Sequence, residues 1–208
     1  MVKRKLNNKL LASAEAKVTS DPKYGKELTL IDTFFNKHPQ NVDLNIVAAK
    51  VALINITNST HLSRYKSKLS LYDVSNIIIG IKDIDKRLEQ SDIGLVEEIA
   101  KMTKKKFNIN LFSFASKYCC YHNIHVYQKD DYSIFDTIVK EHLKDYNTST
   151  LWVSTYKVNK WRESFSYKEY NEYISNLLDN HNITLPNRRR AFDHYLWYNN
   201  KGKSTSTP

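Results

Sequence analysis

The stretch from Lys101 to Asn123, KMTKKKFNINLFSFASKYCCYHN, decides the fold expected for this chain. It holds two apolar periods of helical spacing, which are separated by the basic run Lys104 to Lys106 and a compact hairpin at Phe107 to Phe114. Such a pair of helices can direct backbone N–H groups and the positive end of its second helix at a phosphate. The stretch therefore predicts a helix-hairpin-helix element.

Apolar residues also recur at helical spacing in other parts of the chain. The segments that we expect to be helical are 27–35, 43–62, 70–81, 84–88, 95–105 and 188–197. Only four Gly and four Pro occur, too few for the many tight turns of a β-sandwich or barrel. The sequence predicts an all-α fold, and 208 residues suffice for one domain or two closely packed lobes.

The two ends of the chain differ in composition from its middle. The start, MVKRKLNNKLLASAEAK, is basic with an apolar patch too short for a secretion signal, and the end, NNKGKSTSTP, is typical of a disordered tail. We expect a basic arm at 1–25, a helical domain at 26–198 and a disordered tail at 199–208. No stretch approaches the roughly 20 apolar residues that span a bilayer, so we expect no membrane partner.

The charge of the chain indicates a polyanionic partner. Its 32 basic and 22 acidic residues give a net charge of +10, and nucleic acid is the polyanion that this excess favours. The alternative is that Lys-rich and Asn-rich usage reflects an AT-rich genome. Cys119 and Cys120 are the only cysteines, which excludes a disulfide framework and fits a reducing cytoplasm.

A lysine and an aspartate stand in matched settings, Lys117 in FASK (114–117) at the opening of one helical stretch and Asp136 in IFDT (134–137) at the opening of the next. An uncharged amine can attack an electrophilic carbon to form an imine, and a nearby carboxylate can stabilise positive charge on a sugar. Two simpler roles stay open, because Lys117 can bind a phosphate and Asp136 can cap a helix.

With these residues the chain resembles the helix-hairpin-helix DNA glycosylase superfamily, in particular its 8-oxoguanine glycosylase-like branch with a catalytic lysine. In that family the lysine starts the helix after the hairpin and an aspartate starts a later helix; Lys117 and Asp136 fit both placements and are 19 positions apart. The resemblance covers chiefly residues 93 to 145. One departure is that the hairpin, 107–114, contains no glycine, so a left-handed turn there must use Asn or another loop shape.

The resemblance implies two packed helical lobes with a substrate cleft between them, into which a modified nucleotide of duplex DNA is flipped. Lys117 would then attack C1′ as the base leaves, and Asp136 would stabilise the transition state. β-Elimination from the resulting imine would add lyase activity at the abasic site. The resemblance to this branch suggests oxidised guanine as substrate, and a hypermodified phage base such as glucosylated hydroxymethylcytosine is the second possibility. The expected role is therefore DNA repair or antiphage defence by a cytoplasmic, nucleoid-associated monomer.

Further residues are candidates for contacts with DNA. The backbone-binding candidates are Lys104, Lys105, Lys106, Asn108, Asn110 and Ser116. The base-pocket candidates are Asn55, Asn58, Thr60, Asp193, Tyr195 and Trp197. The simpler interpretation is a capped helix end for the first three of these and core packing for the aromatic residues.

Other classes of function stay open. The chain could be a noncatalytic helix-hairpin-helix DNA-binding protein, or a nuclease that uses its basic and aromatic surface. His122 and His125 have a spacing that can place two ligands on one helical face, but no acidic or Cys cluster completes a metal site. We therefore expect neither a metal nor another cofactor.

Overall fold

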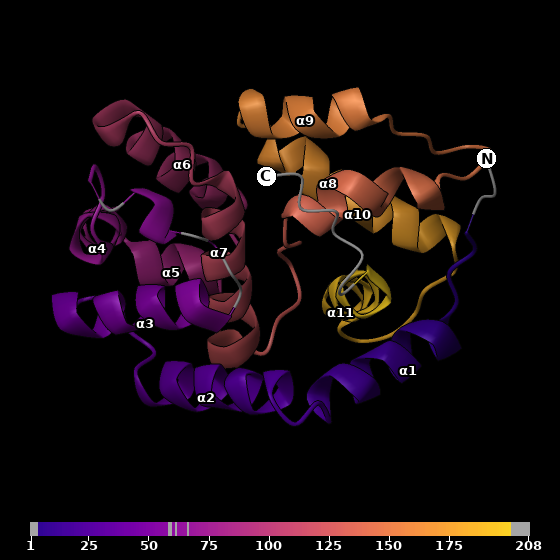
Figure 1. Ribbon diagram of the computed structural model, residues 1–208, viewed down its shortest axis with the longest axis horizontal. Coiled ribbons are helices and arrows are strands. Elements are labelled where there is room, and N and C mark those ends of the chain that lie inside the picture. The colour runs from indigo at the N-terminus through magenta and orange to yellow at the C-terminus, as the bar shows by residue number, and fades with distance from the viewer. Residues whose placement is uncertain (1–3, 58–59, 61, 66, 201–208) are drawn as a thin grey trace.

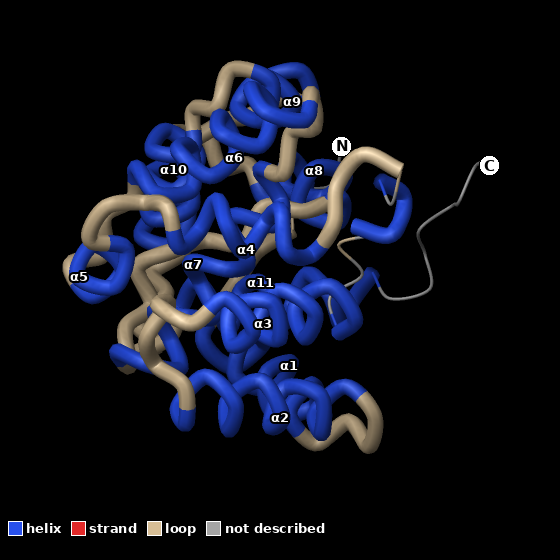
Figure 2. Tube along the Cα trace, turned by 90° about the vertical axis from the view of Figure 1, so that its left-hand side faces the viewer, coloured by secondary structure: helices blue, strands red, loops and turns tan. Residues whose placement is uncertain are grey.

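The computed structural model describes residues 4–57, 60, 62–65 and 67–200. Within these residues the backbone forms eleven α-helices and two short 3-10 helices and no strand, which confirms the all-α prediction (Figure 2). No helix in the described ranges is both long enough and apolar enough to cross a bilayer.

The helices follow one another with short connections. Their bounds are α1 Asn8–Thr19, α2 Tyr24–Lys37, α3 Leu44–Thr57, η1 Leu62–Tyr65, α4 Leu71–Ile79, α5 Ile84–Glu89, α6 Gly94–Phe107, α7 Phe112–Tyr127, α8 Thr137–His142, η2 Leu143–Tyr146, α9 Thr155–Glu163, α10 Tyr167–Asn180 and α11 Arg188–Asn200. Every segment that was expected to be helical overlaps one of these helices.

The helices fall into two groups, which we call the α3–α7 lobe and the α8–α11 lobe (Figure 1). Helix α2 runs along the α3–α7 lobe and contacts both α3 and α7, whereas α1 lies along α11 in the other lobe. The buried apolar side chains of both lobes form one continuous cluster. The connection from α7 to α8, residues 128–136, carries the chain from one lobe to the other.

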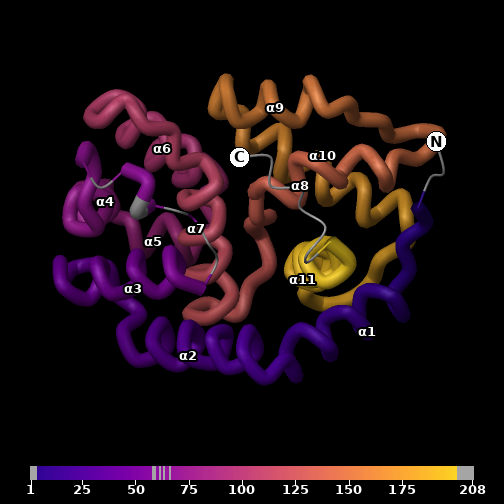
Figure 3. Tube along the Cα trace, in the orientation of Figure 1, coloured from indigo at the N-terminus to yellow at the C-terminus, as the bar shows by residue number. Residues whose placement is uncertain are grey.

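The first helix corrects the expectation of a basic arm at 1–25. Leu6, Leu11 and Val18 are fully buried, and α1 packs against α11, which comes from the far end of the sequence (Figure 3). Leu11 and Val18 lie on α1 and Leu6 lies just before it, and the many basic residues around them obscured this apolar pattern. At the other end, α11 continues through Asn200, so the expected tail begins too early, and its residues 201–208 lie outside the described ranges.

The connection between α6 and α7 is shorter than the expected hairpin at 107–114. Helix α6 ends at Phe107 and α7 begins at Phe112. Asn108 follows α6 with φ 59°, so an asparagine adopts the left-handed conformation for which glycine is the usual residue. Because α7 begins earlier than expected, Lys117 lies in its second turn. The sequence had predicted Lys117 at the opening of this helix.

Buried Lys50 contacts both the connection between α2 and α3 and helix α7. The Nζ atom of Lys50 lies 3.1 Å from the Gln40 carbonyl oxygen, 3.1 Å from Asn41 Oδ1 and 3.2 Å from His122 Nε2. Tyr118 donates to the same Asn41 oxygen at 2.5 Å. Burial lowers the pKa of Lys50 from 10.5 to about 8, although the charge of Asp85 opposes this change.

The lowered pKa of Lys50 predicts a stability that depends on pH. Between pH 8 and 10.5 the unfolded chain holds a proton at Lys50 that the folded chain gives up, so the free energy of unfolding rises with pH in this window. We expect Lys50→Met to remove this rise, as measured by urea unfolding at pH 7.5 and 9.5. Lys26→Met, at an exposed position of α2, is the control that keeps it. Equal pH dependence in the wild type and Lys50→Met would contradict the prediction.

Candidate active site

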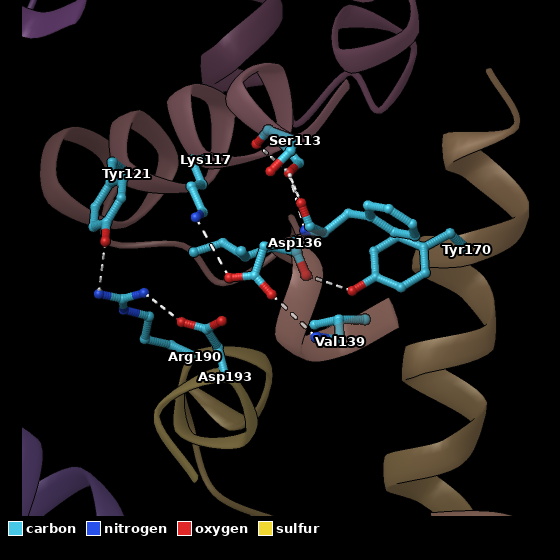
Figure 4. A network of polar contacts seen from close by, with 11 residues as sticks. Ser113, Lys117, Tyr121, Asp136, Val139, Tyr170, Arg190 and Asp193 are labelled. Atoms are coloured by element: carbon cyan, nitrogen blue, oxygen red, sulfur yellow. Dashed lines mark hydrogen bonds and ion pairs between the residues drawn. The ribbon is translucent and has the colours of Figure 1, made fainter. Parts of the chain in front are cut away.

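Lys117 and Asp136 meet where the two lobes adjoin. Lys117 projects from α7 and Asp136 precedes α8, and the distance from Lys117 Nζ to Asp136 Oδ2 is 3.4 Å (Figure 4). The Lys117 side chain is 7% exposed and that of Asp136 is 19% exposed. A primary amine and a carboxylate are thus held together in a largely buried setting.

Asp136 also caps a helix, as the sequence analysis allowed. Its backbone is extended, and its Oδ1 accepts a hydrogen bond from the N–H of Val139 at 3.0 Å, so one oxygen caps α8 while the other faces Lys117. Capping and contact with the amine therefore coexist in one side chain.

The segment before Asp136 is fastened at several points. Ser116 Oγ accepts a hydrogen bond from the N–H of Phe135 at 3.0 Å, and Tyr170 donates its hydroxyl hydrogen to the carbonyl of Ile134. The Phe135 ring packs edge-on against Phe112 and Tyr170, with centroids 5.1 and 5.0 Å apart. These contacts with α7 and α10 set the position of Asp136 relative to Lys117.

Helix α11 adds a second ion pair beside the first. Arg190 is 5% exposed, and its Nη1 donates to Asp193 Oδ2 at 2.9 Å. Its Nη2 lies 3.3 Å from the hydroxyl oxygen of Tyr121, and its guanidinium carbon lies 4.8 Å from the centre of that ring. Tyr121 is one turn after Lys117 on α7, so Lys117 and the Arg190 pair approach the same space (Figure 4).

The charges of this space act on one another. Burial raises the pKa of Asp193 to about 6, Arg190 opposes the rise, the charge of Asp136 adds to it and that of Lys117 reduces it. Asp193 therefore lies within the electrostatic reach of both members of the Lys117 pair. The cluster has two cations and two anions, so its formal charges cancel.

A third carboxylate fixes α11 in place. Asp130, in the connection between α7 and α8, accepts hydrogen bonds from the N–H groups of Arg189 at 2.7 Å and Arg190 at 3.1 Å. Burial raises the pKa of Asp130 to about 7, although the two N–H groups and the charge of Arg189 oppose the rise. The start of α11, and with it Arg190, is tied to the connection that carries Asp136.

The cavity beside this cluster is small. It lies between α8, α10 and α11, is lined by Val139, Tyr170 and Asp193 among others, and has a volume of about 10 Å³. This is about the space of one water molecule, so a nucleotide can reach Asp193 only if the lobes or their side chains move.

The backbone-binding candidates divide into exposed and buried residues. Lys104, Lys105 and Lys106 are exposed in the last turn of α6, and Lys104 Nζ donates to Asn108 Oδ1 at 2.6 Å. Asn110 Nδ2 donates to the Arg162 carbonyl at the end of α9, at 2.9 Å. Ser116 is fully buried and its hydroxyl bonds to protein backbone, which corrects its assignment as a contact to DNA.

Of the polar base-pocket candidates, Asn55 and Thr60 bond to each other. Asn55 Oδ1 accepts from Thr60 Oγ1 at 2.8 Å and from the N–H of Leu62 at 2.9 Å, so this side chain joins α3 to the segment that follows it. Asn58 lies outside the described residues.

The candidates on α11 separate in the same way. Trp197 stacks on Tyr24 with centroids 4.3 Å apart, and Tyr195 packs edge-on against Tyr146, so both contribute to packing. Asp193 is the member of the α11 set that the structure brings to Lys117 and Asp136.

Arg190 and Tyr121 are two site residues that were not predicted from the sequence. Arg190 lies three residues before Asp193 and Tyr121 four after Lys117, spacings that place each pair on one helical face. The two histidines make separate contacts. His122 Nε2 lies near Lys50 Nζ, whereas His125 Nδ1 lies 2.8 Å from Asp32 Oδ1. Among the residues that the structure describes, no group of three or more His, Cys, Asp or Glu side chains is arranged to hold a metal.

Comparison with known proteins identifies a family. Residues 5–131 match the HI_0787_N family model, which is described as an N-terminal domain. The chain belongs to the HI_0787_N family. A Haemophilus influenzae protein described as uncharacterized is 31% identical over 147 residues, and this alignment covers 69% of the chain but only 62% of the relative. No solved structure matches the chain. The family model includes Lys117 and ends before Asp136.

Two substitutions separate the capping role of Asp136 from its contact with Lys117. Asp136→Asn and Asp136→Ala both remove the negative charge, but only Asn keeps an oxygen for the N–H of Val139. We expect the Ala variant to be less stable than the Asn variant by about 1 kcal/mol in urea unfolding. Ser154→Asn and Ser154→Ala, at the N-cap of α9, provide the calibration. Equal stability of the two Asp136 variants, with a normal difference at Ser154, would show that the cap contributes nothing.

Proposed function

We propose that this protein is a DNA glycosylase that flips a modified base out of duplex DNA and cleaves its N-glycosidic bond. The observation that carries the proposal is the contact between Lys117 Nζ and Asp136 Oδ2, two groups on different helices in a largely buried setting. A structural ion pair alone would also explain the contact, but the resemblance to glycosylases selects the same two residues.

The proposed reaction uses each group once. The uncharged amine of Lys117 attacks C1′ of the flipped nucleotide as the base departs, and the carboxylate of Asp136 stabilises the positive charge that develops on the sugar. The covalent adduct rearranges to an imine, and β-elimination of the 3′ phosphate from it breaks the strand. Hydrolysis of the imine without elimination leaves an abasic site.

The proposed DNA contact is made by the four-residue connection between α6 and α7. We interpret it as a helix-hairpin-helix element in which Asn108 takes the position of a hairpin glycine. The lysines at the end of α6 lie next to it and add positive charge for a phosphate backbone. Binding in a cleft between the lobes would require them to separate, because the cavity at Asp193 is too small for a nucleotide.

The substrate follows from the proposed branch. Oxidised guanine is the first candidate, and a hypermodified phage base such as glucosylated hydroxymethylcytosine is the second, which corresponds to genome repair or antiphage defence. A noncatalytic DNA-binding protein and a nuclease are the competing functions. The proposed protein acts as a monomer in the cytoplasm, at the nucleoid.

Covalent trapping with borohydride tests the amine. We expect the wild type to form a reduced adduct with duplexes that carry a preformed abasic site, because these need no base recognition. The same assay with 8-oxoguanine, uracil, alkylated bases and glucosylated hydroxymethylcytosine then identifies the base. Lys117→Gln should abolish the adduct, whereas Lys101→Gln, at an exposed position of α6, should leave it unchanged.

The outcomes separate the competing functions. An adduct that persists in a folded Lys117→Gln variant would disprove the role of this amine. DNA binding by the wild type with no adduct on any duplex would favour the noncatalytic protein. Metal-dependent breaks in undamaged DNA would favour the nuclease.

The lysines of α6 give a separate prediction about binding. Each phosphate contact that is lost lowers the slope of log affinity against log salt by about 0.9. We expect single Ala substitutions at Lys104, Lys105 and Lys106 to weaken binding equally for all DNA sequences, with this smaller slope, as measured by fluorescence anisotropy. Lys9→Ala and Lys26→Ala, at exposed positions of α1 and α2, are the controls. An unchanged slope in all three α6 variants would contradict the contact.

A further inference from the structure

Lys117 is paired with the carboxylate of Asp136, and its ammonium group needs a base to accept a proton before it can react. An ammonium group has no lone pair, so Lys117 must lose a proton before its nitrogen can attack C1′. Asp136 stabilises the developing positive charge on the sugar only while it carries a negative charge. A second base near Lys117 would allow Asp136 to stay ionised.

Asp193 is placed for this task. Its Oδ2 accepts from Arg190 Nη1 at 2.9 Å, its side chain is 16% exposed, and it lines the small cavity with Val139 and Tyr170. Figure 4 shows the Asp193 carboxylate directed toward the space that contains Lys117 and Asp136. The buried Arg190 holds one carboxylate oxygen, which leaves the other to exchange a proton.

The arrangement of these groups leads to one inference, which rests on the proposed glycosylase function. We propose that Asp193 is the proton acceptor for Lys117 and returns that proton to the departing base. Arg190 is the residue that positions it.

The proposed reaction moves one proton from Lys117 to the departing base by way of Asp193. One proton passes from the Lys117 ammonium to the Asp193 carboxylate, which gives an amine and a neutral carboxyl group. The amine lone pair forms the bond to C1′ while the N-glycosidic bond breaks. The electron pair of the broken glycosidic bond leaves with the base. The carboxyl group of Asp193 then protonates the base, which departs neutral, and Asp193 is a carboxylate again.

The electrostatics of the site suit a group that gains and loses a proton near neutral pH. Burial raises the pKa of Asp193 to about 6, which brings it close to the range where proton transfer in both directions is efficient. The titratable and charged groups that surround it come from every helix packed against it. They are Tyr24 from α2, Lys117 and Cys120 from α7, Asp136 before α8, Tyr170 from α10, and Arg189 and Arg190 from α11, and Tyr121 of α7 bonds to Arg190.

The test follows the rate of borohydride trapping on DNA with a preformed abasic site, and of base release, from pH 5 to pH 10. In the wild type we expect the rates to rise with pH through an inflection near 6, as Asp193 ionises. Asp193→Asn should lose this inflection and slow both reactions by roughly 10²- to 10⁴-fold at pH 7. The trapping rate of this variant should recover toward pH 10, because hydroxide ions then replace the missing carboxylate as the base, and a merely structural defect would not recover.

Controls make each outcome decisive. Asp179→Asn removes the carboxylate of another Asp–Arg pair, that of α10 and Arg188, and should keep the wild-type profile. Asp193→Glu should keep the inflection at a reduced rate. Wild-type rates in Asp193→Asn, or a wild-type profile without an inflection between pH 5 and 7, would each overturn the inference, the second even if the Asn variant fails to fold. Absence of trapping by the wild type at every pH would instead overturn the glycosylase proposal itself.

Discussion

The contact between Lys117 and Asp136 is the constraint on which the arrangement of the two lobes around the candidate site depends. A buried ammonium group costs several kcal/mol unless an opposite charge lies beside it, and Asp136 comes from the far side of the α7–α8 connection. Arg190 and Asp193 repeat the arrangement from α11. The two pairs give a neutral cluster, so α7, α8 and α11 can approach one another without leaving an uncompensated buried charge.

The part of the site that follows from local sequence was predictable. Helix ends have local signals, and Asp136 before a helical segment is one of them, so its position as a cap could be predicted from residues 134–137 alone. The start of α7 was harder to predict. Asn108 takes the left-handed conformation and Asn110 accepts from the N–H of Phe112, whereas a glycine-rich hairpin would have marked this turn clearly in the sequence. As a result Lys117 was expected at a helix opening, where helix-dipole potential is strongest, but lies in the second turn.

The part of the site that depends on tertiary contacts was not predictable in this way. Arg190 belongs to a run of three arginines, and its sequence alone does not say which of them is buried. The reason is Asp130, which bonds the first turn of α11 from a segment some 60 positions away and thereby directs Arg190 toward Tyr121. The same limit explains the N-terminal helix, whose buried face became visible only with its partner α11.

The division of the site between the lobes also bears on what the family match implies. Residues 5–131 include Lys117, Tyr121 and Asp130, but both carboxylates that face the lysine, Asp136 and Asp193, lie beyond them. A lysine on α7 without those carboxylates would lack the two acidic groups on which the proposed chemistry depends. The chemistry proposed for Lys117 therefore belongs to the two lobes together, and a relative that shares only the matched region would need other acidic groups to use its lysine in the same way.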